Sequence, residues 1–418
     1  MQCPNFNREM VERPARRSFT ESEAGPLLAG PEQWLRVRKQ LTVRPAAYAE
    51  LLAMAEGYLA SPGYAVTDKK CPPPGGSLHD YASLSKYYWP NPDTPDHLPW
   101  IVRDGIRNPA ADDYDFPRFL EFCLAVTTLA GAAKLTGERK YAVRAADLLR
   151  RWFLNPATRM NPDLNHAQFS PGNFPASPSG VIDFHFFCEL LEAVRLLGLG
   201  DGWGSEDREG LRNWFREFSL CVSTSPLTRR EESARNNHGT WYDLLYVSIA
   251  LFTGDRQGVL RQFREHSIPR LDSQIDANAA MPFEEERTLS LTYCYFNLLG
   301  WSWLAGLGKT LGIDLWHHKN RHGATLRQVC LRLLPAFLGK VPWKGRQIAP
   351  PPRDIEYCRL FAVVSLLDEI PEIRDFLGRT TANPIWRLPC FMTDDDWQQP
   401  PRGSEQEKAF LSSLSGRG

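Results

Sequence analysis

Residues 119–153 read FLEFCLAVTTLAGAAKLTGERKYAVRAADLLRRWF, and this stretch predicts one helical hairpin. Its apolar residues recur at spacings of three and four, which is typical of helices that bury one face. The first helix is expected to end at Gly137, because glycine readily adopts the left-handed conformation that closes a helix. The second helix is expected over residues 141–153, after an acidic restart at Glu138.

The same pattern returns in residues 241–266, WYDLLYVSIALFTGDRQGVLRQFREH. Here Thr253-Gly254-Asp255 repeats the stop and restart seen at Thr136-Gly137-Glu138. Further helices are expected at 183–197, 207–222, 289–311, 324–338 and 355–368. Helix pairs joined by short glycine turns predict an all-α fold, either an α/α toroid or an α-solenoid. The pattern alone does not separate these two architectures.

The chain divides into three parts by composition. Residues 1–30 predict a poorly structured lead-in, residues 31–375 predict one helical domain, and residues 376–418 predict a Pro-rich tail that packs on the surface or is disordered. Within the domain, residues 61–115 are rich in Pro, Gly and aromatic residues. They predict a long ordered loop region, and loops of that length in compact domains usually have a function.

Charge and cysteine content exclude several classes of protein. The 418 residues include 49 Lys+Arg and 49 Asp+Glu, so whole-chain attraction to nucleic acid or anionic lipid has no support, although a local basic groove for an anionic ligand is compatible with this balance. Nine cysteines without Cys-x-x-Cys spacing argue against a disulfide framework or a zinc site, and favour a reducing compartment. The polar N-terminus lacks a secretory signal, and no window approaches the apolar length of a membrane span. We therefore expect a cytoplasmic protein, or a secreted one if the true start lies upstream.

The segment Arg235-Asn236-Asn237-His238-Gly239 lies where a loop is expected to enter a helix. Two amides and an imidazole beside the free N–H groups of a helix start can hold an anion. The alternative interpretation is an Asn N-cap followed by an unrelated histidine.

A second polar pattern lies in Arg287-Thr288-Leu289-Ser290-Leu291-Thr292-Tyr293 and continues to Asn297. On a helix, Ser290, Tyr293 and Asn297 share one face, which must meet a partner helix, a cavity or water. A buried tyrosine satisfied by a neighbouring helix would give the same pattern.

Two loop segments could bind sugars. Met160-Asn161-Pro162-Asp163-Leu164-Asn165-His166-Ala167-Gln168 is crowded with amides, and Tyr87-Tyr88-Trp89 lies in an aromatic cluster that begins near His79. The high Trp and Tyr content also suits carbohydrate binding, although aromatics are common in ordinary cores. The chain has no Gly-rich phosphate loop, no His-Glu-x-x-His and no Gly-x-Ser-x-Gly motif.

Taken in order, these segments resemble the alginate lyase family of polysaccharide lyases, which includes glucuronan-type lyases. The resemblance rests on YASLSKYYWPNPDTPDHLPWIVRDG (81–105), MNPDLNHAQFSPG (160–172) with GVID (180–183), ARNNHGTWYD (234–243) and ERTLSLTYCYFN (286–297), with a weaker match at Gln347-Ile348. It implies an α/α toroid with a deep cleft. Lys86, the loop PGNFPASPSG and the missing secretion signal depart from the family pattern, which leaves the substrate, its length and the location open.

The resemblance also implies a set of functional residues. An Asn-His pair and a later Tyr with a nearby Arg correspond to the catalytic residues Asn237, His238, Arg287 and Tyr293. The residues expected to contact the sugar are Tyr88, Trp89, Asn165, His166, Gln168, Trp241 and Asn297. No cofactor or metal is expected, and the expected partner of the monomer is an anionic polysaccharide or oligosaccharide.

The chemistry is consistent with these residue types. β-Elimination from a 4-linked uronate removes the C5 proton and expels the C4 oxygen, so the carboxylate charge must be neutralised by Asn237 with Arg287 or a backbone N–H. His238 suits the base and Tyr293 the acid, although a tyrosine beside a cation could also be the base.

Three alternative functions remain open. A glycoside hydrolase on a related toroid would need two carboxylates across the substrate, for which Asp80, Asp183 and Glu284–Glu286 are candidates. The other two are a non-enzymatic helical scaffold or glycan-binding protein, and an intracellular lyase or dehydratase for a small uronate-like substrate. The sequence does not choose among mannuronate, guluronate and glucuronate, or between endo and exo action.

Overall fold

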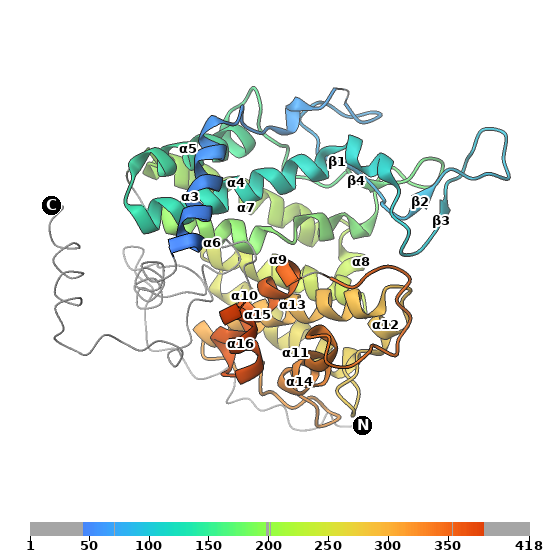
Figure 1. Ribbon diagram of the computed structural model, residues 1–418. Coiled ribbons are helices and arrows are strands. Elements are labelled where there is room, and N and C mark those ends of the chain that lie inside the picture. Colours follow the sequence, from blue (N-terminus) through green and yellow to red (C-terminus); the bar gives the residue numbers. More distant parts are fainter. Residues whose placement is uncertain (1–44, 71, 198–199, 201, 353, 380–418) are drawn as a thin grey trace, which may run out of the picture.

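The computed structural model describes residues 45–70, 72–197, 200, 202–352 and 354–379 (Figure 1). The chain is mostly helical and adopts the α/α toroid fold. Its helices up to α9 are α3 (Pro45–Ala60), α4 (Asp115–Thr136), α5 (Arg139–Leu149), α6 (Phe187–Leu197), α7 (Ser205–Thr224), α8 (Arg229–Glu232) and α9 (Asn237–Thr253). The later helices are α10 (Arg256–Gln262), α11 (Ile268–Gln274), α12 (Pro282–Glu285), α13 (Ser290–Thr310), α14 (Leu326–Phe337), α15 (Asp354–Leu367) and α16 (Pro371–Arg379).

The predicted hairpins are present. Gly137 closes α4 in the left-handed conformation (φ 75°) and donates its N–H to the carbonyl of Ala133. Gly254 closes α9 in the same way (φ 89°), with its N–H donated to the carbonyl of Ala250. These two glycines reverse the chain between paired helices, as their spacing predicted.

Helices α9 and α13 connect the two groups of helices seen in Figure 1. The helix α4 packs against α3, α5 and α6, whereas α9 packs against α6, α7, α10 and α13. In turn, α13 packs against α14 and α15. The beginnings of α9 and α13 carry the four predicted catalytic residues, so this helix pair positions the candidate site.

The loop region 61–115 contributes three strands to two small sheets that the apolar spacing did not predict. The strand β1 (Ala82–Leu84) pairs in parallel with β4 (His166–Phe169), and β2 (Tyr88–Trp89) pairs antiparallel with β3 (Ile101–Val102). Figure 1 shows the β2–β3 ribbon extending away from the helices. Strands of two to four residues are too short to give a readable alternation of apolar and polar residues.

A cluster of aromatic side chains fills the space between α4 and α7. Phe122 and Trp152 stack with ring centroids 4.7 Å apart, and Trp214 stacks on Phe218 at 5.2 Å. Most of α4 is buried in this core, although it is also long and apolar enough to cross a membrane by length and composition. Its burial among α3, α5 and α6 identifies it as a core helix.

The predicted lead-in 1–30 lies outside the described residues, as does the tail beyond residue 379. The helix α16 runs through residue 376, where the tail was expected to begin. None of the six cysteines that the structure describes forms a disulfide.

Candidate active site

The start of α9 holds the first half of the site. Asn236 is the N-cap, and its side chain accepts a hydrogen bond from the backbone N–H of His238. Asn237 and His238 therefore occupy the first turn, where the backbone N–H groups are not used by the helix itself.

His238 is held in one orientation by Glu231, a residue of α8. The Nδ1 atom of His238 lies 2.6 Å from Oε2 of Glu231, whose side chain is only 8% exposed. A carboxylate accepts hydrogen bonds, so Nδ1 carries the proton and Nε2 of the neutral ring keeps its lone pair. The His238 side chain is 22% exposed, and Nε2 has no partner among the described residues, which leaves it free to act on a substrate.

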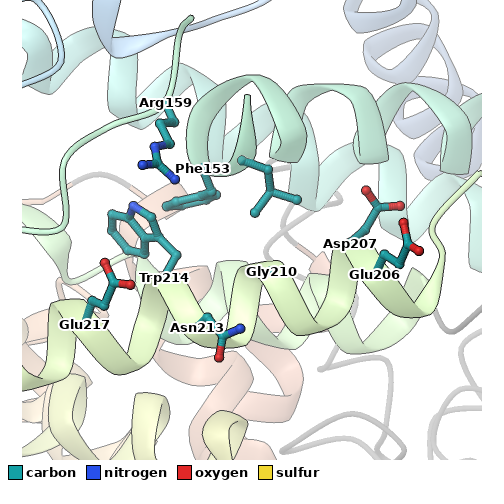
Figure 2. A pocket seen from close by; sticks show the side chains of 9 residues that line it. Phe153, Arg159, Glu206, Asp207, Gly210, Asn213, Trp214 and Glu217 are labelled. Atoms are coloured by element: carbon teal, nitrogen blue, oxygen red, sulfur yellow. The ribbon is translucent and has the colours of Figure 1, made fainter. Parts of the chain in front are cut away.

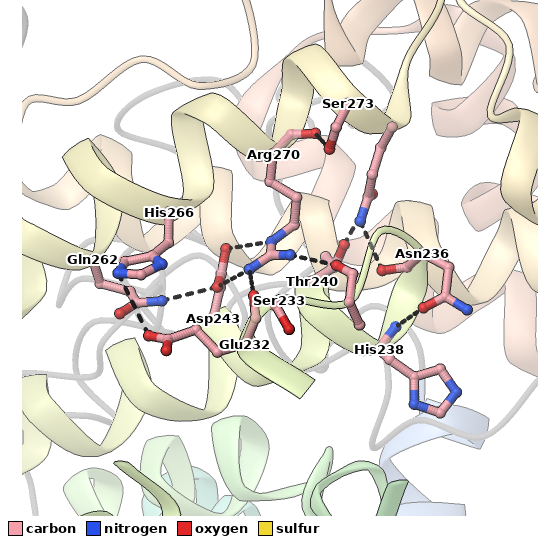
Figure 3. Close-up of polar contacts among 12 residues, drawn as sticks. Glu232, Ser233, Asn236, His238, Thr240, Asp243, Gln262, His266, Arg270 and Ser273 are labelled. Atoms are coloured by element: carbon pink, nitrogen blue, oxygen red, sulfur yellow. Dashed lines mark hydrogen bonds and ion pairs between the residues drawn. The ribbon is translucent and has the colours of Figure 1, made fainter. Parts of the chain in front are cut away.

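The segment between Glu231 and His238 is fixed by Arg270 (Figure 3). The Arg270 guanidinium forms a buried ion pair with Asp243 at 2.9 Å. It also donates hydrogen bonds to the carbonyls of Ala234 (2.6 Å) and Glu232 (2.7 Å). One buried side chain on α11 thus ties α9 to the turn that carries Glu231.

The start of α13 holds the second half of the site. The Arg287 guanidinium donates a hydrogen bond to the Tyr293 hydroxyl at 2.9 Å, and its central carbon lies 3.9 Å from the centre of the Tyr293 ring. Tyr293 in turn donates to the Tyr87 hydroxyl at 3.1 Å. Asp104 binds Arg287 at 2.6 Å, so two residues of the 81–105 segment contact this pair.

The electrostatic environment keeps Tyr293 protonated. Burial is the largest effect and raises the pKa of the Tyr293 hydroxyl far above its usual range; the neighbouring Tyr87 raises it further, while Arg287 lowers it. Arg287 lowers the pKa of Asp104 through its hydrogen bonds, against an opposing effect of burial. Tyr293 is thus a neutral phenol and Asp104 a carboxylate at neutral pH.

The weakly matching Gln347 stabilises the beginning of α13. Its Oε1 accepts the backbone N–H of Leu291 at 3.1 Å, and its Nε2 donates to Thr292 at 2.9 Å. The backbone N–H of Ser290 is accepted by the carbonyl of Arg346. Gln347 therefore positions the turn that leads to Tyr293.

Glu284 connects the two halves. Its carboxylate accepts the backbone N–H of Asn237 at 2.5 Å and the side-chain amide of Asn237 at 2.7 Å. Burial raises the pKa of Glu284, while the Asn237 hydrogen bonds and the charges of Arg287 and His238 lower it. Glu284 thus binds Asn237 directly and lies close enough to Arg287 and His238 for their charges to act on it.

The predicted sugar-contacting residues have different surroundings. Gln168 is half-buried with φ 47°, which is rare outside glycine, and its Nε2 donates to Asp183 at 2.7 Å. Tyr88 and Trp89 are half-buried on β2, His166 is half-buried on β4, and Asn165 is exposed. These five side chains retain surface that a ligand can reach.

Trp241 and Asn297 are a correction to the predicted sugar contacts. Both are 1% exposed, and the Asn297 amide donates to Gln274 at 3.0 Å. Both side chains lie on the same helix faces as His238 and Tyr293, but there they pack in the contact between α9 and α13. They are therefore part of the core and do not line the ligand surface. Asn237 is also fully buried, with its Oδ1 unpartnered.

Two of the carboxylates of the hydrolase alternative, Asp183 and Glu284, are buried. Asp183 is 6% exposed and accepts hydrogen bonds from Tyr81, Ser83 and Gln168; burial raises its pKa. Glu284 is 1% exposed and bound to Asn237. A hydrolase needs two carboxyl groups that reach the scissile bond from opposite sides, which these buried groups cannot do.

A surface pocket of about 330 Å³ lies elsewhere, along α7 (Figure 2). Its charged lining comprises Arg159, Glu206, Asp207 and Glu217. Three acids against one arginine repel a polyanion, and none of the predicted catalytic residues lines this pocket. We therefore do not assign the substrate to it.

Three residues of the site, Glu231, Tyr87 and Asp104, were not predicted from the sequence. Glu284 was considered only as a hydrolase carboxylate, and its contact with Asn237 was not predicted. Asp104 and Tyr87 contact Arg287 and Tyr293 across more than 180 positions of sequence. Tyr87 did lie in the aromatic segment noted above, and the 81–105 segment contained both.

Known proteins resemble this chain over most of its length. A family model described as alginate lyase matches residues 65–343. The crystal structure of an alginate lyase from Bacteroides ovatus is 30% identical, covers 89% of this chain and 100% of its own, and superposes with a TM-score of 0.81. No curated protein matches the chain in a sequence search.

More distant structures share the fold. A histidine-to-alanine variant of alginate lyase A1-III, complexed with a tetrasaccharide, is 14% identical, covers 80% of this chain and 89% of its own, and has a TM-score of 0.53. Alginate lyase A1-III from Sphingomonas species A1 is 15% identical, covers 83% of this chain and 95% of its own, and has a TM-score of 0.50.

Proposed function

Because the chain belongs to the alginate lyase family and is a polysaccharide lyase, we propose that it cleaves 4-linked uronic-acid glycans of the alginate or glucuronan type by β-elimination. The observations that carry this proposal are the hydrogen-bonded set Arg287–Tyr293–Tyr87 and the oriented pair His238–Glu231. They combine a cation, a protonated phenol and an imidazole with a free nitrogen. The product would carry an unsaturated uronate at its new non-reducing end.

Arg287 is the group that neutralises the substrate carboxylate in this proposal. Removing the C5 proton places negative charge on the carboxylate, and a fixed cation stabilises that charge most where water is excluded. The Arg287 side chain is 25% exposed and is held by Asp104, so its orientation does not have to be established during the reaction. The second N–H of the Asn237 amide supplies a further donor if substrate binding exposes it, while the first N–H holds Glu284.

His238 is the base. Its proton on Nδ1 is bound to Glu231, which leaves Nε2 to accept the C5 proton. Glu231 then faces the imidazolium that forms and stabilises its positive charge, as a buried carboxylate does for a catalytic histidine.

Tyr293 is the acid. Since burial keeps its hydroxyl protonated, it has a proton to give to the C4 oxygen as the glycosidic bond breaks. The Arg287 N–H that it accepts stabilises the phenolate left behind. His238 and Tyr293 together account for both proton transfers. C5 loses its proton to His238, the C4–C5 double bond forms, and the leaving oxygen takes the proton of Tyr293.

The proposal is tested by incubating the purified chain with polymannuronate, polyguluronate, polyglucuronate and a neutral 4-linked glucan. We expect ultraviolet absorbance from a C4–C5 unsaturated uronate with at least one uronate polymer and none with the glucan. Mass spectrometry of the products separates the two chemistries, because elimination products are lighter by one water than hydrolysis products. Fragments that all carry the added water would contradict the proposed reaction.

A further inference from the structure

His185 is a histidine that the mechanism above does not use. It follows the 3-10 helix η5 (Pro178–Phe184), and its Nδ1 lies 2.7 Å from the carbonyl oxygen of Ile182. Because a carbonyl only accepts, Nδ1 carries the proton and Nε2 is an acceptor. The residue is half-buried, and Nε2 has no hydrogen-bond partner among the described residues and is not sealed from solvent.

Two aromatic contacts place His185 against α9 and α13, the two helices that carry the candidate site. Its ring lies 5.3 Å from that of Trp241 and 5.4 Å from that of Phe296, between centroids. Trp241 follows His238 by three residues on α9, and Phe296 follows Tyr293 by three residues on α13. Residues three apart share a helix face, so His185 packs one turn beyond the proposed base and the proposed acid at once.

Burial and the positive charges around His185 keep its ring neutral. Burial is the main cause that lowers its pKa well below the usual value, and the positive charges of Arg359 and Lys86 lower it further, whereas the hydrogen bond to Ile182 raises it. Arg359 is paired with Glu189, and Lys86 precedes Tyr87, the hydrogen-bond partner of Tyr293. A neutral ring with a free Nε2 can accept a hydrogen bond from a hydroxyl group. It carries no positive charge that would attract a carboxylate.

We infer that His185 is a substrate-binding residue that accepts a hydrogen bond from a hydroxyl of the uronate next to the scissile bond. This inference rests on the proposed function, since it names how the same site recognises its sugar. A single neutral acceptor at a fixed position distinguishes sugars by where their hydroxyls point. Mannuronate and glucuronate differ only in the orientation of the C2 hydroxyl, so these two are the informative pair.

The test uses His185→Phe, which keeps the ring packed on Trp241 and Phe296 but removes Nε2, and His185→Gln, which restores a side-chain acceptor. Kinetics are measured with the polymer that the wild type prefers. Dissociation constants of defined mannuronate and glucuronate oligomers are measured in a Tyr293→Phe background by calorimetry. The control is His318→Phe, another half-buried histidine in the loop beyond the far end of α13.

We expect His185→Phe to raise KM and Kd about tenfold for the preferred sugar with little change in kcat, because one neutral hydrogen bond accounts for about that factor. The preference between mannuronate and glucuronate oligomers should shrink, and His185→Gln should recover most of the affinity. The His318→Phe control should match the wild type.

The other outcomes separate the two proposals. Unchanged KM and Kd in His185→Phe overturn the inference and leave the lyase proposal intact. A loss that His185→Gln does not rescue, with a lowered Tm, identifies His185 as structural and also overturns it. If the wild type forms no unsaturated product but oligomer binding still depends on His185, the proposed function fails and the inference stands; if no oligomer binds, both fail.

Discussion

At the scale of single residues, Glu231 determines which nitrogen of His238 can react. The 2.6 Å contact to Nδ1 fixes the tautomer, and the low exposure of the carboxylate prevents water from replacing it. The Asn-Asn-His pattern points to His238, but nothing in the sequence distinguishes Glu231 from the other acids of the same segment. Only the turn between α8 and α9, held by Arg270, brings that carboxylate to the ring.

Glu231→Gln should therefore lower kcat by about 100-fold or more, since a misoriented or wrongly protonated histidine is a poor base. The glutamine amide can donate to Nδ1 and favour the tautomer whose lone pair points away from the substrate. Steady-state elimination rates measure the effect, and circular dichroism checks the fold.

The neighbouring Glu232→Gln is the matched control. Its side chain is half-buried and pairs with His266 at 3.4 Å, not with His238. Equal losses of kcat in both variants would mean that general charge on α8, and not the orientation of His238, supports the activity.

At the scale of elements, the long helices could be predicted from spacing, and the short elements could not. The helices α4, α7, α9, α13 and α14 lie within a few residues of the predicted ranges, because each has an apolar face of three or more turns. The strands β1–β4 and the four-residue helices α8 and α12 depend on tertiary contacts that local patterns do not record. Tyr87 and Asp104 reach the site through such elements.

The first turn of α9 has room for glycine alone at position 239. A Cβ atom there would lie 2.0 Å from Nη1 of Arg270 and 2.3 Å from the carbonyl oxygen of Ala234. We expect Gly239→Ala to lower the free energy of unfolding by about 2 kcal/mol or more, through overpacking and loss of the Arg270 hydrogen bonds. Elimination activity should fall as well, because the same turn carries His238.

Gly57→Ala is the matched control, since a Cβ at this position of α3 meets nothing within 4 Å. Replacing a glycine inside a helix by alanine stabilises by about 0.5–1 kcal/mol. Chemical denaturation of both variants measures the two effects, and a Gly239→Ala protein as stable as the wild type would contradict the packing described for α9.

At the scale of the whole molecule, half-buried histidines make stability depend on pH. The folded state lowers the pKa of His185 well below 6.5 and also lowers that of His318. As the pH falls below about 6.5, the unfolded chain takes up protons that the folded chain does not, so the free energy of unfolding decreases. Buried carboxyl groups with raised pKa values, such as Glu284 and Asp183, act in the opposite direction at lower pH.

Comparison with a variant isolates the histidine contribution. The free energy of unfolding of the wild type, measured by urea denaturation from about pH 7.5 to pH 5, should fall more steeply than that of His185→Phe. Parallel curves for the two proteins would show that His185 titrates in the folded state as it does in the unfolded chain, against the burial described here.

The overall architecture was predictable as far as a choice between toroid and solenoid, because both stack the same hairpins. The family resemblance resolved that choice, and the structure agrees with it. The burial of Trp241 and Asn297 was not predictable. A polar or aromatic residue on a helix face gives the same sequence pattern whether it contacts a sugar or a neighbouring helix. The surroundings of His185 were likewise not predictable, because its contacts with Trp241 and Phe296 join three segments that are distant in sequence.

In the proposed mechanism, Tyr293 delivers the proton that allows the glycosidic bond to break. Tyr293→Phe keeps the ring under Arg287 and removes only the hydroxyl, and Tyr295→Phe makes the same change two residues later, at a side chain that is 6% exposed and packs on Tyr357. The measurement is the rate of unsaturated product formation on the best uronate polymer, with oligomer affinity and Tm for each variant. We expect Tyr293→Phe to lose about 100-fold or more in kcat with affinity and Tm nearly unchanged, and Tyr295→Phe to keep its turnover. A Tyr293→Phe enzyme that retains most of its activity would contradict the account.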